Sequence, residues 1–168
     1  MNAILHVDKN WGIGKANSLM FRLPRDMAYF KDKTLGKVVV MGANTFRSLP
    51  KQQPLADRIN VVLSIDPMEV PEGVVLVRNM RQLFMTLDDF HVDPGAIWVI
   101  GGASLYRSLF PYCREIYVTK VDADGEADTF VPNLDQDPQY KLVSESEPKE
   151  DNGYTIRFCV YKNIKAGV

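Results

Sequence analysis

The stretch Lys37-Val38-Val39-Val40-Met41-Gly42 is a near-continuous apolar run that ends at a glycine. Such a run is typical of a strand that is covered on both faces, as in a parallel sheet. The stretch Ala96-Ile97-Trp98-Val99-Ile100 has the same character and is followed by Gly101-Gly102. Short helices are expected after both glycine ends, at residues 44–49 and 104–109. These two strand-glycine-helix units predict an α/β fold.

The remaining elements extend this pattern in both directions. Further buried strands are expected at residues 3–7, 59–64 and 74–77, and further helices from Pro24 onward and at residues 80–87. Residues 116–121 and 154–161 alternate between apolar and polar side chains, as antiparallel strands do. We therefore predict a single domain over residues 1–168, with a mostly parallel central twisted sheet, an antiparallel C-terminal edge and flanking helices.

Composition excludes several classes of partner. The 168 residues are 46% hydrophobic and 24% charged, with a net charge of -1, which indicates a globular domain without nucleic acid or membrane as its main partner. Cys113 and Cys159 lie far apart and form no disulfide framework, and His6 and His91 have no metal-ligand spacing. Because no signal peptide is visible and the cysteines form no framework, we expect a cytoplasmic protein. The spacing of the histidines leads us to expect no metal.

The glycine ends of the two units are the first candidate binding site. Ligands of open α/β sheets bind at the carboxyl ends of the strands, which directs attention to Gly42, Ser64 and Gly101-Gly102. Glycine lets the backbone approach a ligand closely, and two such ends facing one crevice would suit a pyrophosphate. The sequence contains neither G-x-G-x-x-G nor a Walker A motif, and each glycine alone is more often a turn residue.

Asp26 is the strongest candidate for chemistry. It follows Pro24 in the first helical turn, where a carboxylate complements the helix dipole, and that structural role is the common one. Helical spacing, however, puts Asp26, Met27 and Phe30 on one arc of about 100° that should face inward. A buried carboxylate there would require a ligand with an amidine-like pair of N–H donors.

Two other features allow alternatives. Arg58 is either a surface arginine paired with Asp57 or a residue that binds a ligand carboxylate through two hydrogen bonds of its guanidinium. The segment 8–21, with Gly12 and Gly14, is either a surface connection or a binding lid. Tyr29, Phe30 and Trp98 are interpreted as core aromatics, and the histidines as packing or surface residues.

The order and spacing of these motifs resemble the dihydrofolate reductase family over nearly the whole chain. The stretches that carry the resemblance are Gly12-Ile13-Gly14, Leu23-Pro24-Arg25-Asp26-Met27 with Phe30-Lys31, Val40-Met41-Gly42 with Thr45, Pro54-Leu55 with Arg58, Val99-Ile100-Gly101-Gly102 with Tyr106, Tyr117-Val118-Thr119, and Asp128-Thr129-Phe130 with Pro132.

The resemblance implies an activity and a site. The family transfers a hydride from NADPH to C6 of 7,8-dihydrofolate while a proton reaches N5. It implies a catalytic group of Asp26, Phe21 and Thr119, with Asp26 binding N3–H and the 2-amino group of the pterin. It implies substrate contacts from Ile4, Leu5, Met27, Phe30, Leu49, Leu55, Arg58 and Ile100. The implied cofactor contacts are His6, Ile13, Gly14, Leu19, Gly42, Ala43, Asn44, Thr45, Leu63, Ser64, Arg78, Ile100, Gly101, Gly102, Ala103, Ser104, Leu105 and Tyr106.

The sequence departs from the family pattern at four places. Phe21 replaces a tryptophan whose indole N–H usually holds a water near the pterin. His6 replaces a small residue, and Ala127 a glycine. Ala43, Ile65 and Ser104 replace the usual 2′-phosphate contacts, which leaves Asn44, Ser64 and Arg78 as possible substitutes. We therefore expect NADPH as cofactor, with weaker discrimination against NADH than is usual.

The resemblance also implies partners, and two other readings compete with it. We expect a monomer that binds dihydrofolate and antifolates of the methotrexate and trimethoprim type. One alternative is a reductase of the same architecture that acts on a ribosylated pyrimidine in riboflavin synthesis. The other is a folate- or nucleotide-binding module without catalysis.

Overall fold

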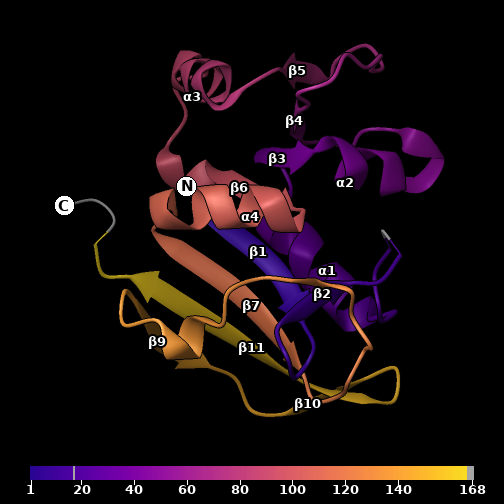
Figure 1. Ribbon diagram of the computed structural model, residues 1–168, viewed down its shortest axis with the longest axis vertical. Helices are drawn as coiled ribbons and strands as arrows, with labels where there is room; N and C mark the ends of the chain where they lie inside the picture. The colour runs from indigo at the N-terminus through magenta and orange to yellow at the C-terminus, as the bar shows by residue number, and fades with distance from the viewer. Residues whose placement is uncertain (17, 166–168) are drawn as a thin grey trace.

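A mixed sheet forms the centre of the computed structural model, which describes residues 1–16 and 18–165 (Figure 1). Its described strands are β1 (Asn2–Val7), β3 (Val38–Gly42), β4 (Ile59–Leu63), β5 (Val75–Val77), β6 (Ile97–Gly101), β7 (Glu115–Val121), β9 (Tyr140–Glu145), β10 (Lys149–Asp151) and β11 (Tyr154–Asn163). They follow one another in the order β10-β11-β7-β1-β6-β3-β4-β5, and β9 also pairs with β11. A separate pair joins β2 (Gly12–Gly14) to β8 (Thr129–Phe130).

The directions of the strands confirm the predicted fold class. Strands β5, β4, β3, β6, β1 and β7 are parallel to one another, whereas β11 is antiparallel to β7, β9 and β10. The prediction of an antiparallel strand at residues 116–121 is wrong on one side. Strand β7 is parallel to β1 and antiparallel to β11, because it lies where the parallel part of the sheet meets the C-terminal edge.

Helices cover both faces of the parallel part, and their limits agree with the predicted ones to within a few residues. They are α1 (Pro24–Thr34), α2 (Ala43–Ser48), α3 (Met80–Asp89) and α4 (Ala103–Leu109), with short 3-10 turns at Pro50–Gln52, Pro94–Ala96, Phe110–Tyr112 and Leu134–Gln136. Side chains alternate along each strand, so successive residues enter different cores. Val38 and Val40 pack with side chains of α3 and α4, whereas Val39 and Met41 pack with α1 and α2.

The C-terminal third contains strands that were not predicted. Strand β9 is exposed along nearly its whole length, and β10 has three residues. A strand on an edge needs no apolar alternation, since it has little core to face, and the hydrophobic pattern therefore gives no signal there. The last residue of β10, Asp151, nevertheless has a structural role, because its carboxylate accepts two backbone hydrogen bonds from the first turn of α1.

Two further observations complete the fold. Cys113 and Cys159 are buried free thiols, and burial raises the pKa of Cys113 to about 12 and of Cys159 to about 11. Both thiols therefore stay protonated and unreactive at neutral pH. Within residues 1–16 and 18–165, no helix is both long and apolar enough to cross a membrane.

Candidate active site

The first turn of α1 carries Asp26, whose side chain contacts residues of β1 and β7. The helix begins at Pro24, as predicted, but its N-cap residue Leu23 offers no side-chain hydrogen bond. Asp151 of β10 supplies that function instead, because its Oδ1 accepts the backbone N–H of Arg25 at 3.1 Å and its Oδ2 that of Asp26 at 3.0 Å. The carboxylate of Asp151 is buried and compensates the free N–H groups of the first turn.

The Asp26 carboxylate is held on both of its oxygens. Oδ1 accepts a hydrogen bond from the Thr119 hydroxyl at 2.6 Å, and Oδ2 lies 3.2 Å from Nδ1 of His6. Its side chain is 14% exposed, so Asp26 is largely shielded without being sealed. It therefore keeps access to a ligand while both oxygens have a fixed direction.

His6 and Thr119 reach Asp26 from neighbouring strands. They are directly paired in the register of β1 and β7, so their side chains leave the sheet side by side. The His6 side chain is 7% exposed, and its Nε2 atom is buried with no hydrogen-bond partner among the described residues. His6 is buried, as the interpretation of a packing residue allows, and its side chain also contacts Asp26, which that interpretation did not include. The spacing within one strand could not reveal a contact that spans three elements.

The predicted substrate residues are only partly brought together. Ile4, Phe30, Leu49, Leu55 and Ile100 belong to the core cluster on the α1 and α2 side of the sheet, beside Trp98. Two predictions need correction. Met27 is 60% exposed rather than inward-facing, and Leu5 packs in the core on the opposite face, since side chains alternate along β1.

Arg58 lies at the entry of β4 and does not bind the residue before it. Its Nη1 donates to the Thr34 hydroxyl at 3.1 Å and its Nε to the Ala56 carbonyl at 2.9 Å. The expected alternative of a pair with Asp57 is thus replaced by two neutral partners. The charge of the guanidinium therefore remains available to an acidic ligand.

The glycine ends of β3 and β6 meet. A Cβ added to Gly42 would lie 3.8 Å from the Gly101 carbonyl oxygen and 3.9 Å from the Gly102 nitrogen. Gly101 has a φ of +121°, which side chains rarely permit, and its peptide bond to Gly102 is cis. Thr45 of α2 faces both glycines, with its Oγ1 3.4 to 3.5 Å from the added Cβ atoms. Bare backbone from two strands is therefore exposed to one small region.

The residues that begin α4 occupy different environments. Ala103 and Ser104 lie at its amino end, whereas Leu105 and Tyr106 are buried, as is most of Leu63 on β4. The Tyr106 hydroxyl donates to the Ile4 carbonyl at 2.7 Å, and burial raises the pKa of Tyr106. Leu63, Leu105 and Tyr106 support the site from the core side.

The three candidate 2′-phosphate residues differ in availability. The Ser64 hydroxyl is buried and donates to the Asp66 carbonyl at 2.6 Å. The Asn44 amide oxygen accepts from Arg47 at 3.3 Å. Arg78 is exposed, and one of its nitrogens donates to the Ile65 carbonyl at 2.9 Å. Arg78 is therefore a cation held at the carboxyl end of β4.

The segment 8–21 is tied to the rest of the fold, apart from residue 17, which lies outside the described residues. Asp8 is buried and accepts the backbone N–H groups of Asn10, Gly12 and Gly125. Asp128 accepts the N–H of Ala16 at 2.8 Å. Gly12 and Gly14 pair with β8, Ile13 packs on the core and Leu19 is 68% exposed.

Phe21 ends this segment and lies near His6. The Phe21 side chain is buried. Its ring centre lies 4.8 Å from that of Tyr154 and 6.1 Å from that of His6. The two departures at Phe21 and His6 are thus neighbours in space.

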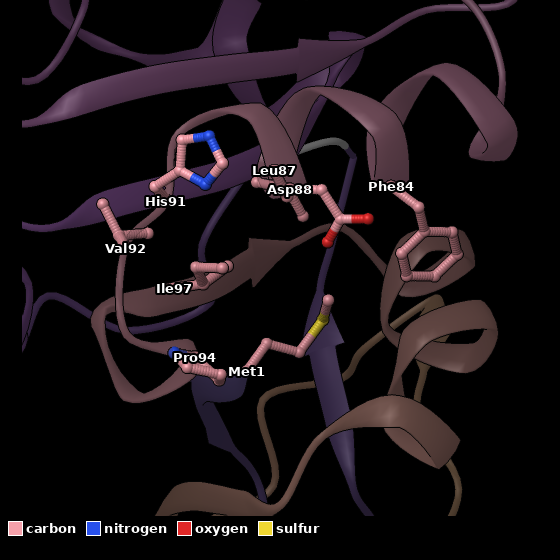
Figure 2. A pocket seen from close by; sticks show the side chains of 8 residues that line it. All are labelled: Met1, Phe84, Leu87, Asp88, His91, Val92, Pro94 and Ile97. Carbon is pink, nitrogen blue, oxygen red and sulfur yellow. The ribbon is translucent and has the colours of Figure 1, made fainter.

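A separate cavity of about 380 Å³ lies at the opposite end of the parallel strands (Figure 2). It is lined by Met1, Ile97 and side chains of α3 and the turn after it, including Phe84, Asp88 and His91. The amino ends of β1 and β6 form this edge, so the cavity has no part in the Asp26 site. Within the described ranges, no group of three or more His, Cys, Asp or Glu could hold a metal ion.

Several known proteins are similar to this chain over nearly its whole length. The family model for dihydrofolate reductase matches residues 1–163. The dihydrofolate reductase of Bacillus subtilis (strain 168) is 37% identical over 169 residues, which cover 98% of this chain and 96% of that protein. The enzyme of Rattus norvegicus is 34% identical, with 96% of each chain covered. The structure of dihydrofolate reductase from Enterococcus faecalis complexed with NADP(H) and RAB-propyl superposes with a TM-score of 0.82, at 29% identity, over 96% of this chain and 94% of that one.

Proposed function

The chain belongs to the dihydrofolate reductase family and reduces dihydrofolate to tetrahydrofolate for one-carbon metabolism, and from this premise we propose the role of each site residue. The observation that carries the assignment of roles is the Asp26 carboxylate, held by Thr119 on one oxygen and shielded from bulk water. A shielded carboxylate requires a matching partner, and the pterin offers two adjacent N–H donors.

Asp26 binds and polarises the substrate. Each carboxylate oxygen has two lone pairs, so one lone pair on each remains after the contacts with Thr119 and His6. These accept N3–H and the 2-amino group of the pterin. The negative charge, in surroundings of low dielectric, favours the transition state in which a proton reaches N5.

The hydride that reaches C6 is supplied by NADPH when it is bound. The protein's own contribution is to place the ring and to exclude water. Phe21 closes the strand side of the site as a hydrocarbon wall and holds no water itself. Thr119 keeps Asp26 oriented, because its short hydrogen bond fixes the direction of one carboxylate oxygen.

The rings of the substrate bind along the apolar cluster on the α1 and α2 side of the sheet. Ile4, Phe30, Leu49, Leu55 and Ile100 offer the apolar wall for the pterin and benzoyl rings, and Met27 covers them from the exposed side. Leu5 contributes through its backbone only, because its side chain is on the other face. Arg58 binds the glutamate carboxylate with its planar guanidinium.

The residues of the β3 and β6 ends fit a dinucleotide. The neighbouring glycines Gly42, Gly101 and Gly102 carry no side chains, which lets a pyrophosphate approach the backbone closely, and Thr45 adds a hydroxyl. Ala43, Asn44, Ala103 and Ser104 complete the two short helix starts. The backbone of His6 and the segment with Ile13, Gly14 and Leu19 cover the nicotinamide end.

We further propose that NADPH is preferred and that Arg78 recognises its 2′-phosphate. Ser64 is buried and already donates to Asp66, and Asn44 is uncharged, so Arg78 is the strongest of the three. Because the side chains of Ala43, Ile65 and Ser104 carry no positive charge that could bind the 2′-phosphate, discrimination against NADH should be weaker than in relatives.

The remaining proposals concern partners and location. Binding of antifolates is supported by the Enterococcus faecalis structure, whose title includes RAB-propyl. A single-domain monomer and a cytoplasmic location are predictions.

The roles proposed for the site are tested by kinetics. Absorbance loss is followed when NADPH and dihydrofolate are mixed with the protein, for the wild type and for Asp26→Asn. Full turnover by the variant at pH 7 would overturn the role of Asp26. Titration with NADPH, NADH and methotrexate measures the ligand preferences.

A further inference from the structure

We propose that His6 is a positioning residue of the active site, which donates a hydrogen bond from Nδ1 to Asp26 and holds that carboxylate in its substrate-binding orientation. The inference rests on the proposed role of Asp26. It assigns to the His6 side chain a function distinct from the backbone role in cofactor binding.

The first argument is geometric. Nδ1 of His6 lies 3.2 Å from Oδ2 of Asp26, while Thr119 donates to Oδ1 at 2.6 Å. A carboxylate with one donor on each oxygen cannot rotate about its Cβ–Cγ bond without losing a hydrogen bond. Both donors come from adjacent, paired positions of β1 and β7, so the sheet itself sets their spacing. The pair therefore acts as a two-point holder for Asp26.

The second argument concerns the position of the proton on His6. Nε2 is buried and has no partner among the described residues. A hydrogen on Nε2 would be a buried donor without an acceptor, which is costly. A hydrogen on Nδ1 meets a carboxylate oxygen. A proton on Nδ1 is therefore the arrangement that the surroundings favour.

The third argument is the lack of any substitute. Among residues 1–16 and 18–165, His6 and Thr119 are the two side chains that hydrogen-bond to the Asp26 side chain. Phe21, whose ring centre lies 6.1 Å from that of His6, has no donor. Asp151, the other acidic group at this end of α1, is engaged with two backbone N–H groups. Without His6, the Oδ2 side of Asp26 would have no protein donor.

The kinetic test distinguishes the packing of the His6 ring from the hydrogen bond that its Nδ1 donates. His6→Phe keeps an aromatic ring and removes the donor, and His6→Ala removes both. His6→Asn places an amide nitrogen at the distance from Cβ at which Nδ1 stands. We expect the rate of hydride transfer to fall about tenfold or more in the Phe and Ala variants, the scale of one hydrogen bond to a charged group. We expect His6→Asn to stay within about threefold of the wild type, on the same scale.

A matched control removes the other histidine of the chain. His91 is exposed and lies beside the cavity at the far end of the strands, and its positive φ of +52° suits asparagine. His91→Asn should leave turnover unchanged. Equal loss in all three His6 variants would indicate a packing role and overturn the proposal, as would unchanged hydride transfer in the Phe and Ala variants.

A second measurement does not depend on turnover. In His91→Asn protein a single histidine remains, so its ¹⁵N shifts report His6 alone. The ¹⁵N pattern of a ring with a proton on Nδ1 is expected, and a ring protonated only on Nε2 would contradict the proposal. If Asp26→Asn kept full activity, the proposed role of Asp26 would fail, whereas the histidine spectrum would still test the hydrogen bond.

Discussion

The buried Asp151 carboxylate accepts the backbone N–H of Asp26 at 3.0 Å and so fixes the position of the Asp26 backbone. Asp151 comes from β10, an edge strand more than a hundred residues along the chain, and it also accepts the N–H of Arg25. The start of the helix, and with it the reacting carboxylate, is thereby attached to the antiparallel edge of the sheet.

This attachment should contribute to both stability and activity. Asp151→Ala should lower the free energy of unfolding by about 1–2 kcal/mol, because two N–H groups of the first turn lose their acceptor. Urea unfolding measures this loss, and KM for dihydrofolate should rise as Asp26 shifts. Glu147→Gln, an exposed change close to the same edge, is the control. A variant as stable as the wild type would contradict this role.

Replacing Asp26 by Asn should leave the fold intact and reduce turnover at pH 7 by about a hundredfold or more, the scale of acid–base assistance. The reduction should shrink at acid pH, where pre-protonated substrate is available. The pH dependence of kcat measures both effects. Asp32→Asn, an exposed change on the same helix, should have no effect.

Arg58→Ala should raise KM for dihydrofolate about tenfold or more, on the scale of one charged hydrogen bond, and leave kcat nearly unchanged. A pteridine substrate without the glutamate should be insensitive to the change. Arg58→Lys keeps the charge and loses the planar fork, so an intermediate KM is expected. Equal KM increases for both substrates would show that the arginine acts through Thr34 instead of the glutamate.

Arg78→Ala should lower kcat/KM for NADPH about tenfold and leave that for NADH unchanged, because only NADPH carries the 2′-phosphate. The ratio of the two values is the measurement, and Arg81→Ala, a nearby exposed arginine, is the control. A strong NADPH preference that survives Arg78→Ala would contradict this assignment.

The attachment of the segment 8–21 should depend on pH. The hydrogen bond from the Ala16 backbone, together with that from Thr129, lowers the pKa of Asp128 below its usual range. An acid with a lowered pKa in the folded state stabilises that state above its ordinary pKa, and the contribution is lost as pH falls through the lowered value. The Ala16 amide proton shift should therefore follow a titration below the usual aspartate range. Asp128→Asn should abolish it, and a midpoint at the ordinary value would contradict the prediction.

Local patterns in the sequence determined the elements that carry the site. The apolar runs that end at Gly42 and Gly101 predicted β3 and β6, and Pro24 predicted the start of α1. These predictions succeeded because a strand covered on both faces and a helix start depend on a few adjacent residues. The family resemblance then indicated which carboxylate matters.

The tertiary structure alone decided what surrounds that carboxylate. Asp26 meets His6, Thr119 and Asp151 from three different strands, and strand β10 has no hydrophobic signal of its own. The outward position of Met27 and the mixed pairing of β7 were decided in the same way. Periodicity specifies which face of an element a residue occupies, whereas hydrogen-bond partners depend on how distant elements are placed against one another.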